Sequence, residues 1–102
     1  MKDLNSINKF LVQCHRIAPS VNAVQAAMMF VMHKYDEPVT QQEIANELGL
    51  RPAMINRHLR PLFDKSGREM VVMEGWNCLY LTDRGKCYCN SLITNARHFF
   101  ST

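Results

Sequence analysis

The sequence lacks the features that define several large classes of protein. Its longest apolar stretch, Ala23–Met32, is interrupted by Gln25 and is about half of the ~20 residues that span a bilayer. Polar residues precede the first apolar cluster, so the N-terminus lacks the basic and then apolar order of a secretory signal. We therefore expect a cytoplasmic protein that has no membrane segment.

Groupings of residues that carry out catalysis are also missing. There is no serine or cysteine elbow, no pair of carboxylates in an apolar setting and no glycine-rich loop that could cradle phosphate. These absences argue against an enzyme. With 102 residues, 47% of them hydrophobic, and no repeat, linker or low-complexity tract, residues 1–102 are expected to form a single domain.

The cysteines indicate neither a disulfide framework nor a metal site. In a cytosolic chain, Cys14, Cys78, Cys87 and Cys89 are more typical of reduced thiols. On a helix, Cys87 and Cys89 would point about 200° apart and could not both face one metal ion. Small apolar packing is their favoured role, although Cys14 could approach either one and form a redox or thiophilic-metal switch. The histidines show no ligand spacing, and we expect no metal and no cofactor.

Charge is unevenly distributed along the chain. The net charge is only +3, from 12 basic and 9 acidic residues. Residues 51–68, however, contain five of the basic residues and only one acidic residue, Asp64. The rest of the chain is slightly acidic, so the whole positive excess lies in this one segment.

Apolar periodicity predicts three helices before residue 50. Leu4, Ile7, Leu11 and Cys14 recur at helical spacing and predict a helix over 3–17. A second, largely buried helix is expected to begin at Ser20 as its N-cap and to end before residues 36–38. The third, over 41–48, begins with the capping box formed by residues 40–43.

A helix-turn-helix follows from the residues that come next. Gly49 can close the third helix in the left-handed conformation, and Pro52 suits the first position of another helix. Ala45 and Ile55 are the small residue and the branched anchor that such a helix pair requires. Residues 40–62 are therefore predicted to form the helix-turn-helix.

A hairpin and a final helix complete the predicted fold. Residues 70–73 and 76–81 are β-rich runs on either side of Glu74 and Gly75, where an antiparallel hairpin can reverse. Thr82 can cap a last helix over about 83–100. The pattern therefore predicts a mainly α fold with a small β-hairpin (α+β), a winged helix-turn-helix in which residues 69–81 form the wing.

The helix from about Pro52 to Leu62 has two distinct faces. If Ile55 points inward, a step of about 100° per residue turns Leu59 and Leu62 inward as well. Asparagine can pair bidentately with adenine, and arginine with guanine, in the major groove of DNA. We therefore predict base reading in double-stranded DNA by the outward residues, which are Ala53, Asn56, Arg57 and Arg60.

Further polar residues flank this face and are expected to contact phosphate, which positions a protein on DNA without reading its sequence. These are Thr40, Gln41, Arg51, His58, Lys65 and Arg68. His58 falls between the two faces and could instead be a packing residue. Pro61 removes a backbone hydrogen bond, so the helix is expected to end or kink there. A merely solvated basic face is the plainer alternative, but it leaves the charge concentration unexplained.

These residues resemble a known group of proteins. The segments 50–62 (LRPAMINRHLRPL) and 79–85 (LYLTDRG) are similar to the winged-helix repressors of the ArsR and MarR families. The resemblance covers about residues 21–86. It implies a homodimeric repressor on a pseudo-palindromic operator, with residues 1–17 and 83–100 as dimerisation helices. Two departures stand out: the wing tip, 73–76, has no basic residue, and the ArsR cysteine pair is absent from 41–48.

Dimerisation also has support from the residues themselves. Apolar positions on the terminal helices are predicted to be too numerous for a monomer of this length to cover. They are Leu4, Ile7, Leu11, Leu92, Phe99 and Phe100.

Other functions and partners stay open at this point. A winged helix could serve phage or plasmid replication or excision, or it could be used for contact between proteins, as the acidic wing with Trp76 suggests. Met28, Met29 and Met32 could line a pocket for a small-molecule effector, as in MarR proteins, although core filling is favoured. A thiol-reactive effector would act through Cys14, Cys87 or Cys89.

Overall fold

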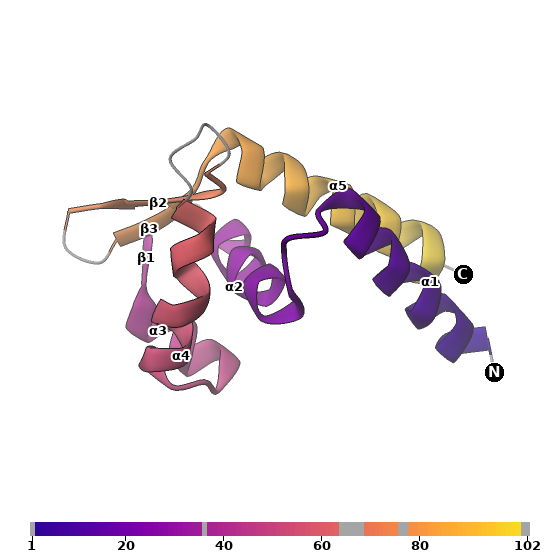
Figure 1. The fold of residues 1–102 in the computed structure, drawn as a ribbon, viewed down its shortest axis with the longest axis horizontal. Helices are drawn as coiled ribbons and strands as arrows, with labels where there is room; N and C mark the ends of the chain where they lie inside the picture. Colours follow the sequence, from indigo (N-terminus) through magenta and orange to yellow (C-terminus); the bar gives the residue numbers. More distant parts are fainter. Residues whose placement is uncertain (1, 36, 64–68, 76–77, 101–102) are drawn as a thin grey trace.

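The computed structural model describes residues 2–35, 37–63, 69–75 and 78–100. Within them, a small sheet projects at one side of the helices, and α1 with α5 extends away on the opposite side (Figure 1). The elements in chain order are α1 (Lys2–Ile17), α2 (Ala23–Lys34), β1 (Val39–Thr40), α3 (Gln41–Leu48), α4 (Pro52–Leu59), the 3₁₀ helix η1 (Arg60–Phe63), β2 (Val71–Glu74), β3 (Cys78–Leu81) and α5 (Asp83–Phe100).

Helix α2 begins two residues later than the sequence predicts. Its N-cap is Asn22 and not Ser20, because Asn22 and Gln25 form a capping box: the Asn22 Oδ1 accepts from the Gln25 N–H at 2.8 Å, and the Gln25 Oε1 accepts from the Asn22 N–H at 2.8 Å. Two backbone donors are thus satisfied reciprocally. Val21 therefore precedes the helix, and Tyr35, which follows its last residue, is 42% exposed.

The start of α3 is as predicted. Its N-cap is Thr40, whose hydroxyl accepts from the Glu43 N–H at 3.1 Å. The Glu43 carboxylate reaches back to the Thr40 N–H and completes the capping box. The predicted bounds, 41–48, are confirmed.

The wing is part of a three-stranded sheet, not a hairpin alone. The strand order is β1-β3-β2, and both pairings are antiparallel. Gly75 reverses the chain after β2 with φ +63°, a conformation open to glycine at little cost. The additional strand, β1, is only two residues long and pairs Val39 with Leu79. It lies directly before α3 and ties the helix-turn-helix to the wing.

The entry into α5 is closely packed against the residues before β2. The Thr82 hydroxyl accepts from the Gly85 N–H at 3.1 Å, so Thr82 caps the helix as predicted. The same hydroxyl donates to the Glu69 carbonyl at 2.7 Å, and the Thr82 N–H donates to the Met70 carbonyl. A Cβ on Gly85 would lie 2.2 Å from that Met70 oxygen, so only glycine fits there.

The hydrophobic core is centred on α2, which contacts α3, α4, α5 and β3. Met28 and Met29 are fully buried, as expected for core filling, while Met32 is buried and also borders a surface cleft. Leu92 belongs to this core, so the expectation that it is an exposed interface residue is wrong. The side chains of Phe99 and Phe100 lie outside the described part. No helix in the described ranges combines the length and apolar character needed to cross a membrane.

Helices α1 and α5 form an antiparallel arm that extends away from the helix-turn-helix (Figure 1). Cys14 and Ile17 of α1 pack toward the core, next to α5. The opposite side of α1 is open, and four of its large apolar residues are between 41% and 55% exposed: Leu4, Ile7, Leu11 and Val12. The arm contributes to the elongated shape, which measures 45 × 30 × 24 Å.

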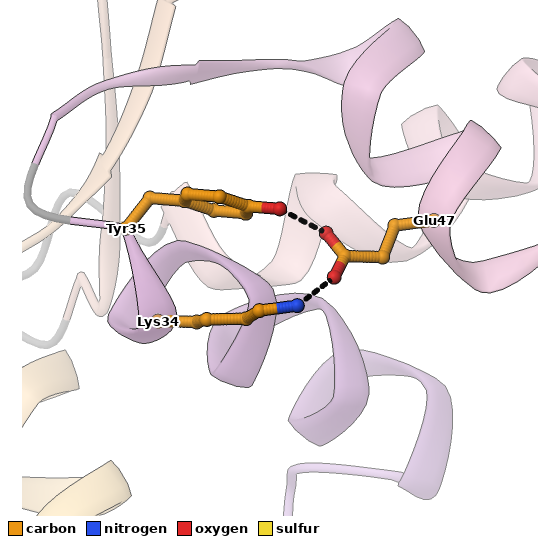
Figure 2. A network of polar contacts seen from close by, with 3 residues as sticks. All are labelled: Lys34, Tyr35 and Glu47. Carbon is orange, nitrogen blue, oxygen red and sulfur yellow. Dashed lines mark hydrogen bonds and ion pairs between the residues drawn. The ribbon is translucent and has the colours of Figure 1, made fainter.

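A polar network holds α3 against the end of α2 (Figure 2). The Lys34 ammonium pairs with the Glu47 carboxylate, and the Tyr35 hydroxyl donates to the other carboxylate oxygen at 3.1 Å. The Lys34 Nζ also lies 5.3 Å from the centre of the Tyr35 ring. The hydrogen bond with Lys34 lowers the pKa of Glu47, and the same bond raises the pKa of Lys34. This contact fixes the first helix of the helix-turn-helix.

Candidate nucleic-acid interface

The turn between α3 and α4 is three residues long and has the predicted chemistry. Gly49 has φ +67°, in the left-handed region, and its N–H donates to the Ala45 carbonyl. The Leu50 N–H donates to the same carbonyl at 3.0 Å. Ala45 is only 1% exposed, so a small side chain stands where the two helices meet. Pro52 occupies the first turn of α4, as predicted.

Helix α4 is shorter than predicted but presents the predicted face. The α-helix ends at Leu59, and η1 replaces the rest of the expected segment to Leu62, because Pro61 cannot donate a hydrogen bond. Ile55 and Leu59 are fully buried. The four predicted base-reading residues are all exposed on this helix or directly after it: Ala53, Asn56, Arg57 and Arg60.

Arg57 and Arg60 are available for an anionic partner. Within the described residues, neither guanidinium is paired with a carboxylate, and the ion pair that forms joins Lys34 of α2 to Glu47 of α3. Arginine carries its charge at any physiological pH and offers five donors in a fixed fork. The exposed side of α4 is therefore cationic and rich in hydrogen-bond donors.

One residue on this side was missed by the sequence analysis. Met54 is 36% exposed, which is high for a large apolar side chain within a helix packed on the core. It lies about 60° from Arg57 around the helix, given a step of about 100° per residue. The signal was present in the sequence, because a rotation counted from Ile55 places Met54 on the flank of the outward face.

The predicted phosphate-contacting residues have different surroundings. Arg51 is exposed at the N-cap position of α4, and its side chain makes no capping hydrogen bond. Gln41 is half-buried at the start of α3. The Thr40 hydroxyl is engaged with Glu43, to whose Oε1 it also donates at 3.1 Å, so a carboxylate stands beside it. Lys65 and Arg68 lie outside the described residues.

His58 is held by α2. Its Nδ1 lies 3.2 Å from the Asn22 Nδ2, and its backbone carbonyl accepts from the Gln25 Nε2 at 3.1 Å. The ring is half-buried. These contacts favour the packing role that the sequence left open as the alternative to phosphate contact.

The wing presents an acidic and apolar surface. Met73 is 40% exposed, and Glu74 is exposed at the end of β2. Burial raises the pKa of Tyr80 on β3, and the neighbouring Glu74 carboxylate raises it further. Trp76 lies outside the described residues. The part of the wing that the structure describes therefore contains no cation for a phosphate.

The cysteines differ in how deeply they are buried. Cys87 is exposed, Cys89 is fully buried, and Cys14 is half-buried, so Cys87 and Cys89 lie on different sides of α5, as their spacing predicts. Burial raises the pKa of Cys89 to about 12 and raises that of Cys14 as well. In the described ranges, no three His, Cys, Asp or Glu side chains are grouped as a metal site requires.

Comparison with known proteins extends the description of the fold. No protein-family model matches the chain, and no curated protein matches it. The structure is similar to RV1404 from Mycobacterium tuberculosis, with a TM-score of 0.72 and 17% identity over 94% of this chain and 70% of that one. It is also similar to the transcriptional repressor CouR, bound to p-coumaroyl-CoA, with a TM-score of 0.66 and 24% identity over 92% of this chain and 64% of that one. Together with the sheet and helix order, these similarities identify the fold as a winged helix-turn-helix.

Proposed function

We propose that this protein is a sequence-specific regulator of transcription that binds double-stranded DNA as a homodimeric repressor. One observation carries the proposal. Helix α4 is anchored by the fully buried Ile55 and Leu59, and it leaves Asn56 and Arg57 open to solvent, with Arg60 exposed directly after it. That combination is what a recognition helix needs in order to dock in a groove while staying attached to its own protein.

The dimensions and chemistry of α4 fit the major groove. The groove of B-DNA is about 12 Å wide and admits one α-helix. Asn56 and Arg57 supply the side chains that pair bidentately with adenine and guanine, and Ala53 allows close approach one turn earlier. Met54 adds an apolar group that can contact a thymine methyl. Arg60 begins η1 and can reach either a base or a phosphate.

The open face of α1 supports a dimer. A row of exposed Leu4, Ile7 and Leu11 on a helix whose other side is packed is costly to leave in water. We propose that a second copy of the chain covers it, which is also what the resemblance to ArsR and MarR proteins implies. Two α4 helices would then enter successive major grooves of a pseudo-palindromic operator.

A small-molecule effector is a further part of the proposal. A cleft of about 580 Å³ lies between the α1–α2 connection, η1 and the start of α5, and Arg60 and Arg84 line it. This volume suits an ordinary ligand. CouR, which shares the fold, is bound to p-coumaroyl-CoA. An acidic molecule in this cleft would compete with DNA for Arg60.

Selection of bound duplexes from a random DNA pool tests the proposal. We expect a two-fold symmetric consensus, because a dimer presents two identical reading helices. Salt titration of the selected duplex should show a steep loss of affinity, since phosphate contacts release counterions. Enrichment of no sequence together with a flat salt dependence would refute DNA binding and favour a winged helix that contacts protein. Footprints at an origin instead of a promoter would favour a replication or excision module.

A further inference from the structure

Helix α4 ends where its backbone loses a hydrogen-bond donor. In the 3₁₀ helix that follows, a carbonyl accepts from the N–H three residues later. The carbonyl of His58 lies just before this 3₁₀ helix, and the residue three positions later is Pro61, which has no N–H. Arg60, directly before the proline, has φ −51° and ψ −48°, a helical conformation that a following proline disfavours. The end of α4 therefore needs support from another part of the molecule.

Gln25 of α2 supplies the missing donor. Its Nε2 donates to the His58 carbonyl at 3.1 Å, although the two residues are 33 positions apart in the sequence. Gln25 is only 3% exposed, so this bond is partly shielded from solvent. Its Oε1 accepts from the Asn22 N–H, which fixes the orientation of the amide because both of its ends have matching partners. A buried carbonyl without a donor would be destabilising.

Asn22 holds the same histidine by its ring. Because the Asn22 Oδ1 accepts from the Gln25 N–H, its Nδ2 is the atom that faces the His58 Nδ1, at 3.2 Å. An amide nitrogen can only donate, so Nδ1 is the acceptor, and the proton of the neutral ring is on Nε2. The first turn of α2 thus holds both the backbone and the ring of His58.

We infer that Gln25 is a positioning residue for DNA reading, which stands in for the absent N–H of Pro61 and sets the orientation of α4. This inference rests on the proposed function. His58 directly follows Arg57 and precedes Arg60 by two residues, so the support acts at the end of α4 that lies next to both arginines. Hydrogen bonds from side chains to bases tolerate misplacement of only about 0.5 Å, so the orientation of this helix of eight residues decides whether its side chains can read DNA.

The test is a double-mutant cycle between Gln25 and Pro61. Gln25→Met keeps the volume but removes the amide, and Pro61→Ala restores an N–H that can reach the His58 carbonyl. We expect Gln25→Met to lower the preference for the selected operator over random duplex about fivefold to tenfold. Pro61→Ala should recover much of that loss in the Gln25→Met background and change little by itself. The matched control is Gln13→Met, the same change on α1, which should have no effect.

Hydrogen exchange provides a readout that does not depend on DNA. In Gln25→Met, the amides of residues 59, 60, 62 and 63 should exchange on the order of tenfold faster, while those of α3 keep their rates. Unchanged exchange at residues 59, 60, 62 and 63, or no rescue by Pro61→Ala, would overturn the role of Gln25. If the wild-type protein showed no preference for any duplex, the proposed function would fail, and the exchange rates alone would then decide whether Gln25 holds α4.

Discussion

Helices α1 and α4 are built alike but present opposite chemistry to their surroundings. Each packs one side against the molecule and leaves the other side open. The open side of α4 carries Asn56 and Arg57 and is continued by Arg60 of η1, whereas that of α1 carries four large apolar residues. A charged face is stable in water without a partner, but an apolar face is not. The comparison suggests that α1 is covered permanently and that α4 is covered only when DNA is bound.

The two helices also differ in how they are held. Helix α4 contacts α2, α3 and η1, and its last turn is fixed by Gln25. Helix α1 packs mainly along α5, at the far side of the molecule (Figure 1). The DNA-reading surface of α4 needs a fixed orientation before it binds. The apolar surface of α1 can be oriented by packing against its partner.

The largest effect is expected from breaking the apolar face. In the double variant Leu4→Asp, Leu11→Asp, two carboxylates replace exposed leucines, and burial against a second copy becomes unfavourable. Sedimentation should show a monomer, and affinity for the two-fold operator should fall about 10²- to 10⁴-fold, because the two reading helices are no longer linked. The control is Asn5→Asp, Asn8→Asp, which adds the same charges at exposed polar positions of α1. A Leu4, Leu11 variant that still sediments as a dimer would show that α1 is not the interface.

A smaller effect is expected from removing the central arginine of the reading face. Arg57→Ala should abolish the preference for operator over random duplex, with a loss of about 5- to 150-fold, while thermal stability is unchanged because the side chain is exposed. Arg16→Ala, at an exposed arginine of α1, is the matched control. Wild-type discrimination in Arg57→Ala would place the base-reading residue elsewhere and remove the main distinction between the two helices.

A third substitution separates positioning from reading within the same region. Arg51 precedes α4 and is exposed without a capping bond, so we predict a phosphate contact. Arg51→Ala should weaken binding to operator and random duplex alike and should reduce the slope of log affinity against log salt by about 0.9. Filter binding at several salt concentrations measures both. A selective loss on the operator would instead assign Arg51 to the bases.

The sequence predicted the local features of this fold better than its contacts over distance. The capping box of α3, the turn at Gly49 and the exposed face of α4 follow from side chains close to one another in the chain. Ser20 and Asn22 are both good caps, and the choice falls on Asn22 because Gln25 stands three residues later, a signal that was available. Strand β1 has two residues, too few for any alternation, and exists through its pairing with β3.

The support of α4 by Gln25 was not predictable in the same way. A glutamine inside an apolar helix reads as an interruption, and its partner is a backbone carbonyl that any residue could supply. The sequence showed only that a backbone donor is missing at Pro61, not which residue replaces it. The burial of Leu92 was likewise decided by how α5 packs on α2 and α1, since its helical spacing fits both an inner and an outer face.

The smallest expected effect is a difference in thiol alkylation on α5, the helix against which α1 packs. It tests whether the arm stays packed, as a defined surface on α1 requires. Both Cys87 and Cys89 are on α5. Cys89 is buried in the core, and burial raises its pKa to about 12, whereas Cys87 is exposed. Thiol alkylation requires the thiolate, and at pH 8 a thiol with such a pKa is ionised in about one molecule in 10⁴. Mass spectrometry should therefore find Cys87 modified first and Cys89 protected, with Cys87→Ser as the control. Equal rates at Cys87 and Cys89 would mean that the core around Cys89 opens to solvent, and the arm formed by α1 and α5 would then not present a fixed surface.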